Sequence, residues 1–189
     1  MDAFQQLIEY PVKHGLEYDT QESHRRFFLS QNDPMGNTKF VLFRSGALFF
    51  YAYDTYSTKV SSTNTFSGLY GVTNRNYPDL KVYKKDFTDT FLRTSKRKTG
   101  FDHIDRQLTI TSGSSDLSSF HLSPDAVRLF LDLEKKFRPL HLLVQNDYLP
   151  NIGELKGKKV IGLQTEQWLY REEDLEVFIR LGEELIGSI

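Results

Sequence analysis

Residues 39–83 contain the feature that most restricts the fold, a series of four β-type segments separated by short turns. Residues 39–44, 47–58, 65–72 and 80–83 are rich in β-branched and aromatic side chains, as strands are. Sequential strands with short connections usually pair as neighbours, which favours an antiparallel meander. The segment 47–58 carries rings on both alternating faces, so we expect it to be covered on both sides.

Helical patterns flank this β-rich middle. Residues 2–14 begin with Asp2, which can cap a helix, and Pro11 is expected to kink or stop that helix. The tripeptide Ser123-Pro124-Asp125 combines a cap, a proline at the first helical position and an acid, which predicts a helix start. Residues 171–186 predict a final helix with an acidic first turn.

The order of these segments predicts an α+β fold, an antiparallel β-meander flanked by an N-terminal helix and two helices in the C-terminal third. Residues 1–189 contain no internal repeat, low-complexity tract or linker, so we expect a single α+β domain. The chain has no Cys, which excludes disulfides, thiolate nucleophiles and Cys-based zinc sites.

The charges nearly cancel, with 24 Lys and Arg against 25 Asp and Glu. This balance indicates neither a polyanion nor an anionic membrane as partner. No apolar run approaches the roughly 20 residues that a membrane-spanning helix needs. The start of the chain lacks the pattern of a signal peptide. We therefore expect a soluble, cytoplasmic protein that binds no membrane.

A basic stretch at residues 93–98, extended by Lys81, Lys84 and Lys85, is a candidate for contact with phosphate. Because the chain as a whole is not basic, a solvated loop is the favoured interpretation. We expect no nucleic acid partner.

Asp102 and His103 are the candidate catalytic residues, since a carboxylate beside an imidazole can orient it for general-base work. Neighbouring residues on a strand point to opposite faces, so a polar turn before a strand is the alternative. Tyr51, Tyr53 and Tyr56 are the candidate binding residues, because their hydroxyls could line a pocket. Core packing with hydroxyls at its rim explains the same pattern.

The five histidines show none of the spacings that place two metal ligands on one helix or strand face. The chain also lacks a serine elbow and a phosphate loop. We therefore expect no metal and no cofactor. A site assembled from distant segments would leave no such motif.

Four short motifs follow one another along the chain: Lys13-His14-Gly15-Leu16-Glu17-Tyr18, Tyr53-Asp54-Thr55-Tyr56-Ser57-Thr58, Gln107-Leu108-Thr109-Ile110-Thr111-Ser112 and Leu122-Ser123-Pro124. Their order resembles an uncharacterised bacterial family of domains of unknown function. The resemblance implies one domain over nearly the whole chain. That family has no assigned activity, so the resemblance implies no site residues.

Three functions follow from these observations. The first is a non-enzymatic protein-binding or accessory domain that engages another protein through a sheet face or an edge strand. The second is an immunity-type or inhibitor protein that uses the acidic residues of the final helix: Glu172, Glu173, Asp174, Glu176, Glu183 and Glu184. The third is a small-ligand binder or enzyme with a site near Asp102, His103 and residues 51–56. The sequence leaves the oligomeric state open.

Overall fold

The computed structural model describes residues 2–22, 37–57, 62–85, 96–149 and 152–189. The strands are β1 (Tyr18–Glu22), β2 (Asn37–Ser45), β3 (Leu48–Ser57), β4 (Ser62–Val72), β5 (Leu80–Lys84), β6 (Lys96–Arg97), β7 (Leu108–Ser112), β8 (Leu140–Asn146) and β9 (Lys159–Thr165). The helices are α1 (Ala3–Lys13), α2 (Asp102–Asp105), α3 (Pro124–Lys136) and α4 (Glu172–Gly187).

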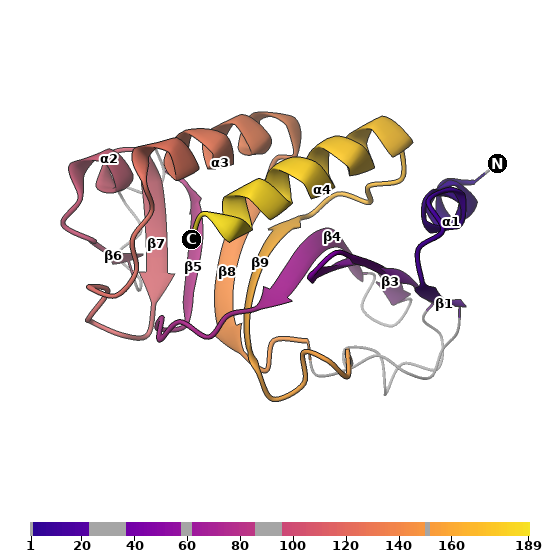
Figure 1. Ribbon diagram of the computed structural model, residues 1–189, viewed down its shortest axis with the longest axis horizontal. Helices are drawn as coiled ribbons and strands as arrows, with labels where there is room; N and C mark the ends of the chain where they lie inside the picture. The colour runs from indigo at the N-terminus through magenta and orange to yellow at the C-terminus, as the bar shows by residue number, and fades with distance from the viewer. Residues whose placement is uncertain (1, 23–36, 58–61, 86–95, 150–151) are drawn as a thin grey trace.

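All nine strands form one antiparallel sheet with the order β1-β2-β3-β4-β9-β8-β5-β7-β6. The predicted α+β fold is confirmed, with a helix at the N-terminus and two longer helices in the C-terminal third (Figure 1). The short helix α2 is an addition to the predicted elements.

The meander is confirmed from β1 to β4, where each strand pairs with the next. The expected adjacency of residues 65–72 and 80–83 is wrong, because the hairpin of β9 and β8 lies between β4 and β5. Apolar partners fix this insertion: Leu69 faces Leu163, and Val82 faces Leu142. A local pattern does not specify such pairing between distant segments.

Local signals at the helix starts are confirmed in two places. Asp2 accepts a hydrogen bond from the backbone amide of Gln5 at 2.9 Å, and Ser123 Oγ accepts one from Ala126 at 3.1 Å. Of the two outcomes expected at Pro11, a kink or a stop, the stop does not occur, because α1 continues to Lys13. The proline ring is buried against the protein, which offsets the lost backbone hydrogen bond.

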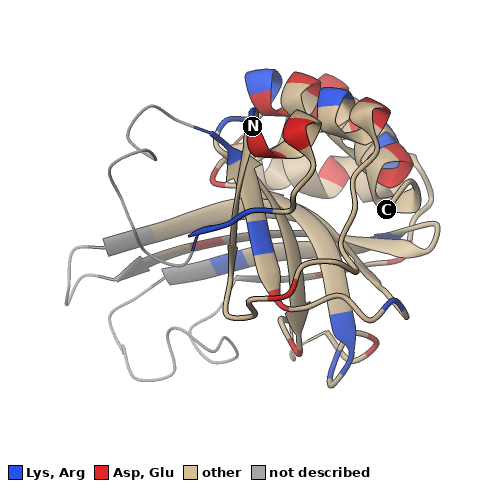
Figure 2. Ribbon diagram, turned by 90° about the vertical axis from the view of Figure 1, so that its left-hand side faces the viewer, with Lys and Arg blue, Asp and Glu red and all other residues tan. Residues whose placement is uncertain are grey.

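Helices α1, α3 and α4 cover one face of the sheet, which we call the helix face (Figure 1). The main hydrophobic core lies between these helices and the sheet, and Phe50, Phe130 and Phe178 are fully buried in it. Lys and Arg lie among Asp and Glu on the helices, but α4 is acidic, with six Asp and Glu against one Arg (Figure 2).

The other face of the sheet, which we call the second face, carries a smaller hydrophobic cluster. Tyr51 and Tyr70 belong to it, and Leu149 and Leu155 of the β8–β9 connection pack against the same cluster. Strand β3 is therefore covered on both sides, as the alternation of its rings predicts. Within the described residues, no helix has the length and apolar character needed to cross a membrane.

Candidate functional site

The predicted catalytic residues Asp102 and His103 both lie in α2 but contact different partners. The exposed carboxylate of Asp102 forms an ion pair with Arg106 at 2.8 Å. His103 Nε2 donates a hydrogen bond to the carbonyl oxygen of Leu122 at 2.8 Å. The carboxylate therefore does not orient the imidazole, and the two side chains do not form an acid–base pair in this arrangement.

The predicted binding residues Tyr51 and Tyr53 are buried in the cluster on the second face. Both rings lie against Phe66, at centroid distances of 5.7 and 5.4 Å. Tyr56 belongs to β3 by its backbone, and its side chain is outside what the structure describes. Strands β4, β9, β8 and β5 separate β3 from β7, which contacts α2. The tyrosines and the segment Asp102–Asp105 therefore do not come together.

The strand register instead assembles a row of residues across the second face. It consists of one residue from each of five neighbouring strands: Gly68 of β4, Gln164 of β9, His141 of β8, Tyr83 of β5 and Thr109 of β7. We call this set the polar row. Directly opposed residues in an antiparallel sheet have Cβ atoms about 5 Å apart. The rings of Tyr83 and His141 accordingly meet edge to face, with centroids 6.3 Å apart.

Tyr70 fixes one end of the polar row. Its ring lies where a Cβ atom would be on Gly68 or on Gly162, so both positions need glycine. The Tyr70 hydroxyl donates to Gln164 Oε1 at 2.8 Å, and the Tyr148 hydroxyl donates to the same oxygen at 2.7 Å. Burial raises the pKa of both phenols, so both are neutral donors at pH 7. Two hydrogen bonds therefore hold the Gln164 side chain in place.

His141 and Lys81 are diagonal neighbours on β8 and β5, beside the centre of the polar row. Burial, and then the charge of Lys81, lower the pKa of His141 from 6.5 to about 4, so the imidazole is neutral at pH 7. Burial also lowers the pKa of Lys81, and the carboxylate of Glu166 opposes that change. Among the described residues, the His141 ring accepts and donates no hydrogen bond, and the Lys81 ammonium forms no ion pair.

The sequence contained one sign of this site. Lys81 and Tyr83 alternate with apolar residues in β5, which predicts that they share a face, and Lys81 was a candidate for contact with phosphate. His141 carried no signal of its own, because its neighbours in the site come from strands that are distant in the sequence.

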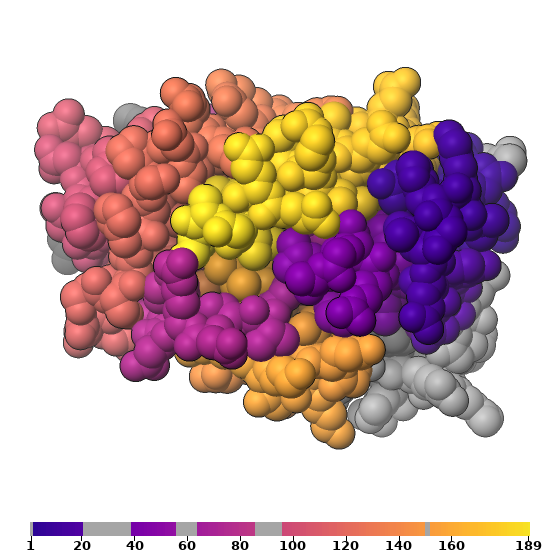
Figure 3. All heavy atoms as spheres, viewed as in Figure 1, coloured from indigo at the N-terminus to yellow at the C-terminus, as the bar shows by residue number. Residues whose placement is uncertain are grey.

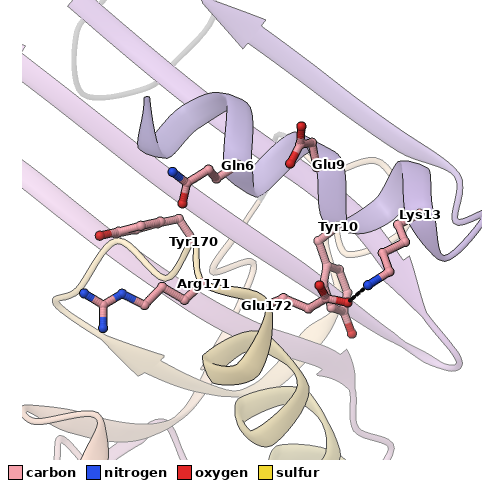
Figure 4. Close-up of a pocket in the computed structure, with 7 residues that line it drawn as sticks. All are labelled: Gln6, Glu9, Tyr10, Lys13, Tyr170, Arg171 and Glu172. Carbon is pink, nitrogen blue, oxygen red and sulfur yellow. Dashed lines mark hydrogen bonds and ion pairs between the residues drawn. The ribbon is translucent and has the colours of Figure 1, made fainter. Parts of the chain in front are cut away.

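A second polar region is a cleft of about 340 Å³ between α1 and the start of α4 (Figure 4). It is lined by Gln6, Glu9, Tyr10, Lys13, Tyr170, Arg171 and Glu172. The Lys13 ammonium lies 2.6 Å from Glu172 Oε1. Hydrogen bonding within this ion pair raises the pKa of Lys13 and lowers the pKa of Glu172, so both groups stay charged.

Segments from near both ends of the chain meet on the surface around this cleft, where α1 (indigo) lies against the C-terminal segment (yellow; Figure 3). Tyr170 also lines a neighbouring cleft of about 460 Å³. There the Lys39 ammonium lies 5.3 Å from the centre of the Phe4 ring, and Trp168 packs against the same ring at 6.3 Å. Both clefts therefore combine aromatic walls with charged groups.

The acidic residues of α4 that the inhibitor hypothesis uses contact the chain itself at three positions. Glu172 pairs with Lys13, Asp174 pairs with Lys136 at 2.9 Å, and Glu183 accepts a hydrogen bond from Ser45 at 2.9 Å. These contacts reduce the negative charge that α4 could offer to a partner.

No protein-family model, no curated protein and no solved structure matches this chain. The resemblance to an uncharacterised bacterial family stays a prediction.

Proposed function

We propose that this protein is a binding domain whose second face holds a small anion, a carboxylate or a phosphate, beside Lys81 and His141. The supporting observation is that these two basic side chains are adjacent and half-buried, and that in the described part of the chain neither has a polar partner. Burial lowers the pKa of Lys81, so its partly buried ammonium is held less favourably than in water. An anionic ligand supplies the acceptor.

Gln164 adds a third donor to this arrangement. Both of its hydrogen bonds end on Oε1, and within the described ranges its Nε2 atom donates to no residue. The half-buried amide lies opposite His141 in the strand register. A ligand with several oxygen atoms can therefore accept from Lys81 and Gln164 and contact the His141 ring at the same time.

Thermal unfolding of the full chain with paired probes tests the proposal. Each pair consists of a charged probe and its neutral counterpart: glycerol phosphate with glycerol, and succinate with succinamide. Only the charged member of each pair should raise the unfolding midpoint. A ligand present at a hundred times its dissociation constant adds about 2.7 kcal/mol to the free energy of unfolding.

Substitutions then assign the binding to the second face. Lys81→Gln and His141→Gln should each weaken binding about ten- to a hundredfold, since a hydrogen bond to a charged group contributes about 1.5 to 3 kcal/mol. Lys156→Gln is the matched control, because Lys156 is exposed in the β8–β9 connection. Equal shifts with charged and neutral probes, or unchanged binding by Lys81→Gln, would contradict the proposal. Unfolding midpoints without ligand show whether each variant is folded.

A protein partner at the sheet edge is the second candidate function. Strand β1 is the first strand of the sheet order, and its described pairing is with β2. A groove of about 200 Å³ runs beside it, lined in part by Tyr18, Arg44 and Phe49, and the Tyr18 side chain is exposed. An extended peptide could add to this edge and place side chains in the groove.

Affinity capture from a native lysate tests the edge-strand proposal. A protein held in stoichiometric amount by the wild type should be lost with Thr20→Pro, which removes a backbone donor from β1. Thr20→Val keeps that donor and should retain the protein. Retention by the proline variant would place the contact elsewhere.

A further inference from the structure

His14, Glu172 and Glu176 meet at the junction of α1 and α4, beside the cleft of Figure 4. An imidazole nitrogen and one oxygen from each carboxylate all lie within 4.8 Å of one another. His14 Nε2 is 3.5 Å from Glu172 Oε1. Two ligands of one tetrahedral zinc ion are about 3.4 Å apart, given bond lengths near 2.0–2.1 Å.

Two distant segments of the chain build this cluster. His14 is the C-cap residue of α1, and its ring lies against Tyr10 with centroids 4.4 Å apart. Glu172 is the first residue of α4, and Glu176 follows one turn later on the same side of the helix. The packing of α1 beside the start of α4 therefore brings a nitrogen ligand to a pair of carboxylates.

The carboxylates create a negative field that the described side chains balance only in part. Glu172 and Glu176 are like charges at i and i+4, which destabilises a helix. The positive end of α4 favours Glu172, but the effect fades after the first turn, before Glu176. The field reaches Tyr10, whose pKa is raised first by burial and then by the charges of Glu176, Glu172 and Glu183.

We propose that His14, Glu172 and Glu176 bind a divalent transition-metal cation that ties α1 to α4. One imidazole and two carboxylates are ligands that Zn²⁺ accepts. Three protein ligands leave a coordination position for water or for a molecule in the cleft. Lys13 competes with the cation, because its ammonium is bonded to Glu172 Oε1. This site is independent of the anion site on the second face.

Calorimetric titration of the full chain with Zn²⁺ tests the site. The wild type should bind one ion per chain, and Zn²⁺ should raise its unfolding midpoint. His14→Gln and Glu176→Gln should each weaken binding roughly tenfold or more, since even changes around a metal ligand cost that much. Lys13→Gln should tighten binding, because it frees Glu172 from its competitor. Glu173→Gln, an exposed neighbour on α4, should bind as the wild type does.

A second pair of histidines provides the decisive control. The rings of His103 and His121 are 5.9 Å apart, so they could also attract Zn²⁺. Zinc binding that survives in His14→Gln and disappears in His121→Asn would overturn the proposal, as would the absence of any binding. His14 and Glu176 are exposed, so the metal-free unfolding midpoint of His14→Gln should be close to that of the wild type, and that of Glu176→Gln should be equal or slightly higher because a like-charge pair is removed.

Discussion

The second face of the sheet and the cleft between α1 and α4 both gather titratable groups from distant parts of the chain. On the second face, burial lowers the pKa of His141 and of Lys81, so it favours their neutral forms. In the cleft, the pKa of Lys13 is raised and that of Glu172 is lowered, so both charged forms are favoured. The first pattern is what burial without a partner produces, and the second is what an exposed ion pair produces.

This difference separates polar groups that the fold already satisfies from groups that a ligand could satisfy. Lys13 and Glu172 complete each other, so a cation in the cleft has to displace Lys13. Lys81 and His141 lie beside each other as two bases, and an anion between them would raise the pKa of both. The two regions should therefore respond differently to substitution, pH and salt.

The largest effect is expected from Gly162→Ala, which disturbs the packing of Tyr70 on the second face. The new Cβ would overlap the Tyr70 ring and approach the carbonyl oxygen of Leu69 to 2.9 Å. Overpacking of this kind costs about 2 to 3 kcal/mol in the free energy of unfolding. Chemical denaturation measures it. Gly153→Ala is the matched control, since a Cβ there meets nothing within 4 Å, and a similar loss in both variants would argue against the Tyr70 packing.

Gln164→Met tests the hydrogen bonds that hold the polar row. It removes the acceptor of the fully buried Tyr70 hydroxyl, which should cost about 2 kcal/mol in the free energy of unfolding. Adding Tyr70→Phe removes the orphaned hydroxyl and should recover part of that loss. Denaturation of the wild type, both single variants and the double variant gives the coupling energy. Additive losses would show that the two side chains do not act together.

The pH dependence of stability tests the burial of His141. Its pKa is about 4 in the folded protein and 6.5 in the unfolded chain, so the unfolded chain binds more protons between these values. The stabilisation is complete above pH 6.5, falls as the pH drops toward 4 and is level below. Because solvent reaches part of the ring, we expect a loss of about 1 to 2 kcal/mol.

Two variants check the assignment of this pH window by denaturation at a series of pH values. His141→Gln should remove the fall in stability that the histidine causes. Lys81→Gln removes the nearby positive charge, so the pKa of His141 should rise and the lower end of the window should move to higher pH. An unchanged profile in both variants would assign the fall to other groups.

The sequence predicted the parts of the fold that local chemistry determines. Asp2 and Ser123 were predicted as caps because a cap depends on residues within one turn. The strand with alternating rings was predicted because side chains on a strand alternate between two faces. At Pro11 the sequence left a kink or a stop open, and the stop does not occur, because a local pattern does not contain the burial of the proline ring.

The sequence did not predict the candidate sites, for a related reason. His141, Lys81 and Gln164 meet only because β9 and β8 insert between β4 and β5. His14 and Glu172 meet only because α1 packs beside α4. Motif spacing reports ligands that share one helix or strand, and these residues do not.

The smallest effect is expected from Lys13→Gln in the metal-free protein. This substitution tests how much the ion pair in the cleft contributes to stability. Both partners of the ion pair are largely exposed, and solvent and salt screen such a pair. At physiological salt the unfolding midpoint should equal that of the wild type, and at low salt it should fall slightly. Thermal unfolding across a salt series measures this difference. A large decrease in the unfolding midpoint that persists at high salt would contradict this expectation. It would mean that the ion pair holds α1 against α4, and that the cleft stabilises the fold as the packing on the second face does.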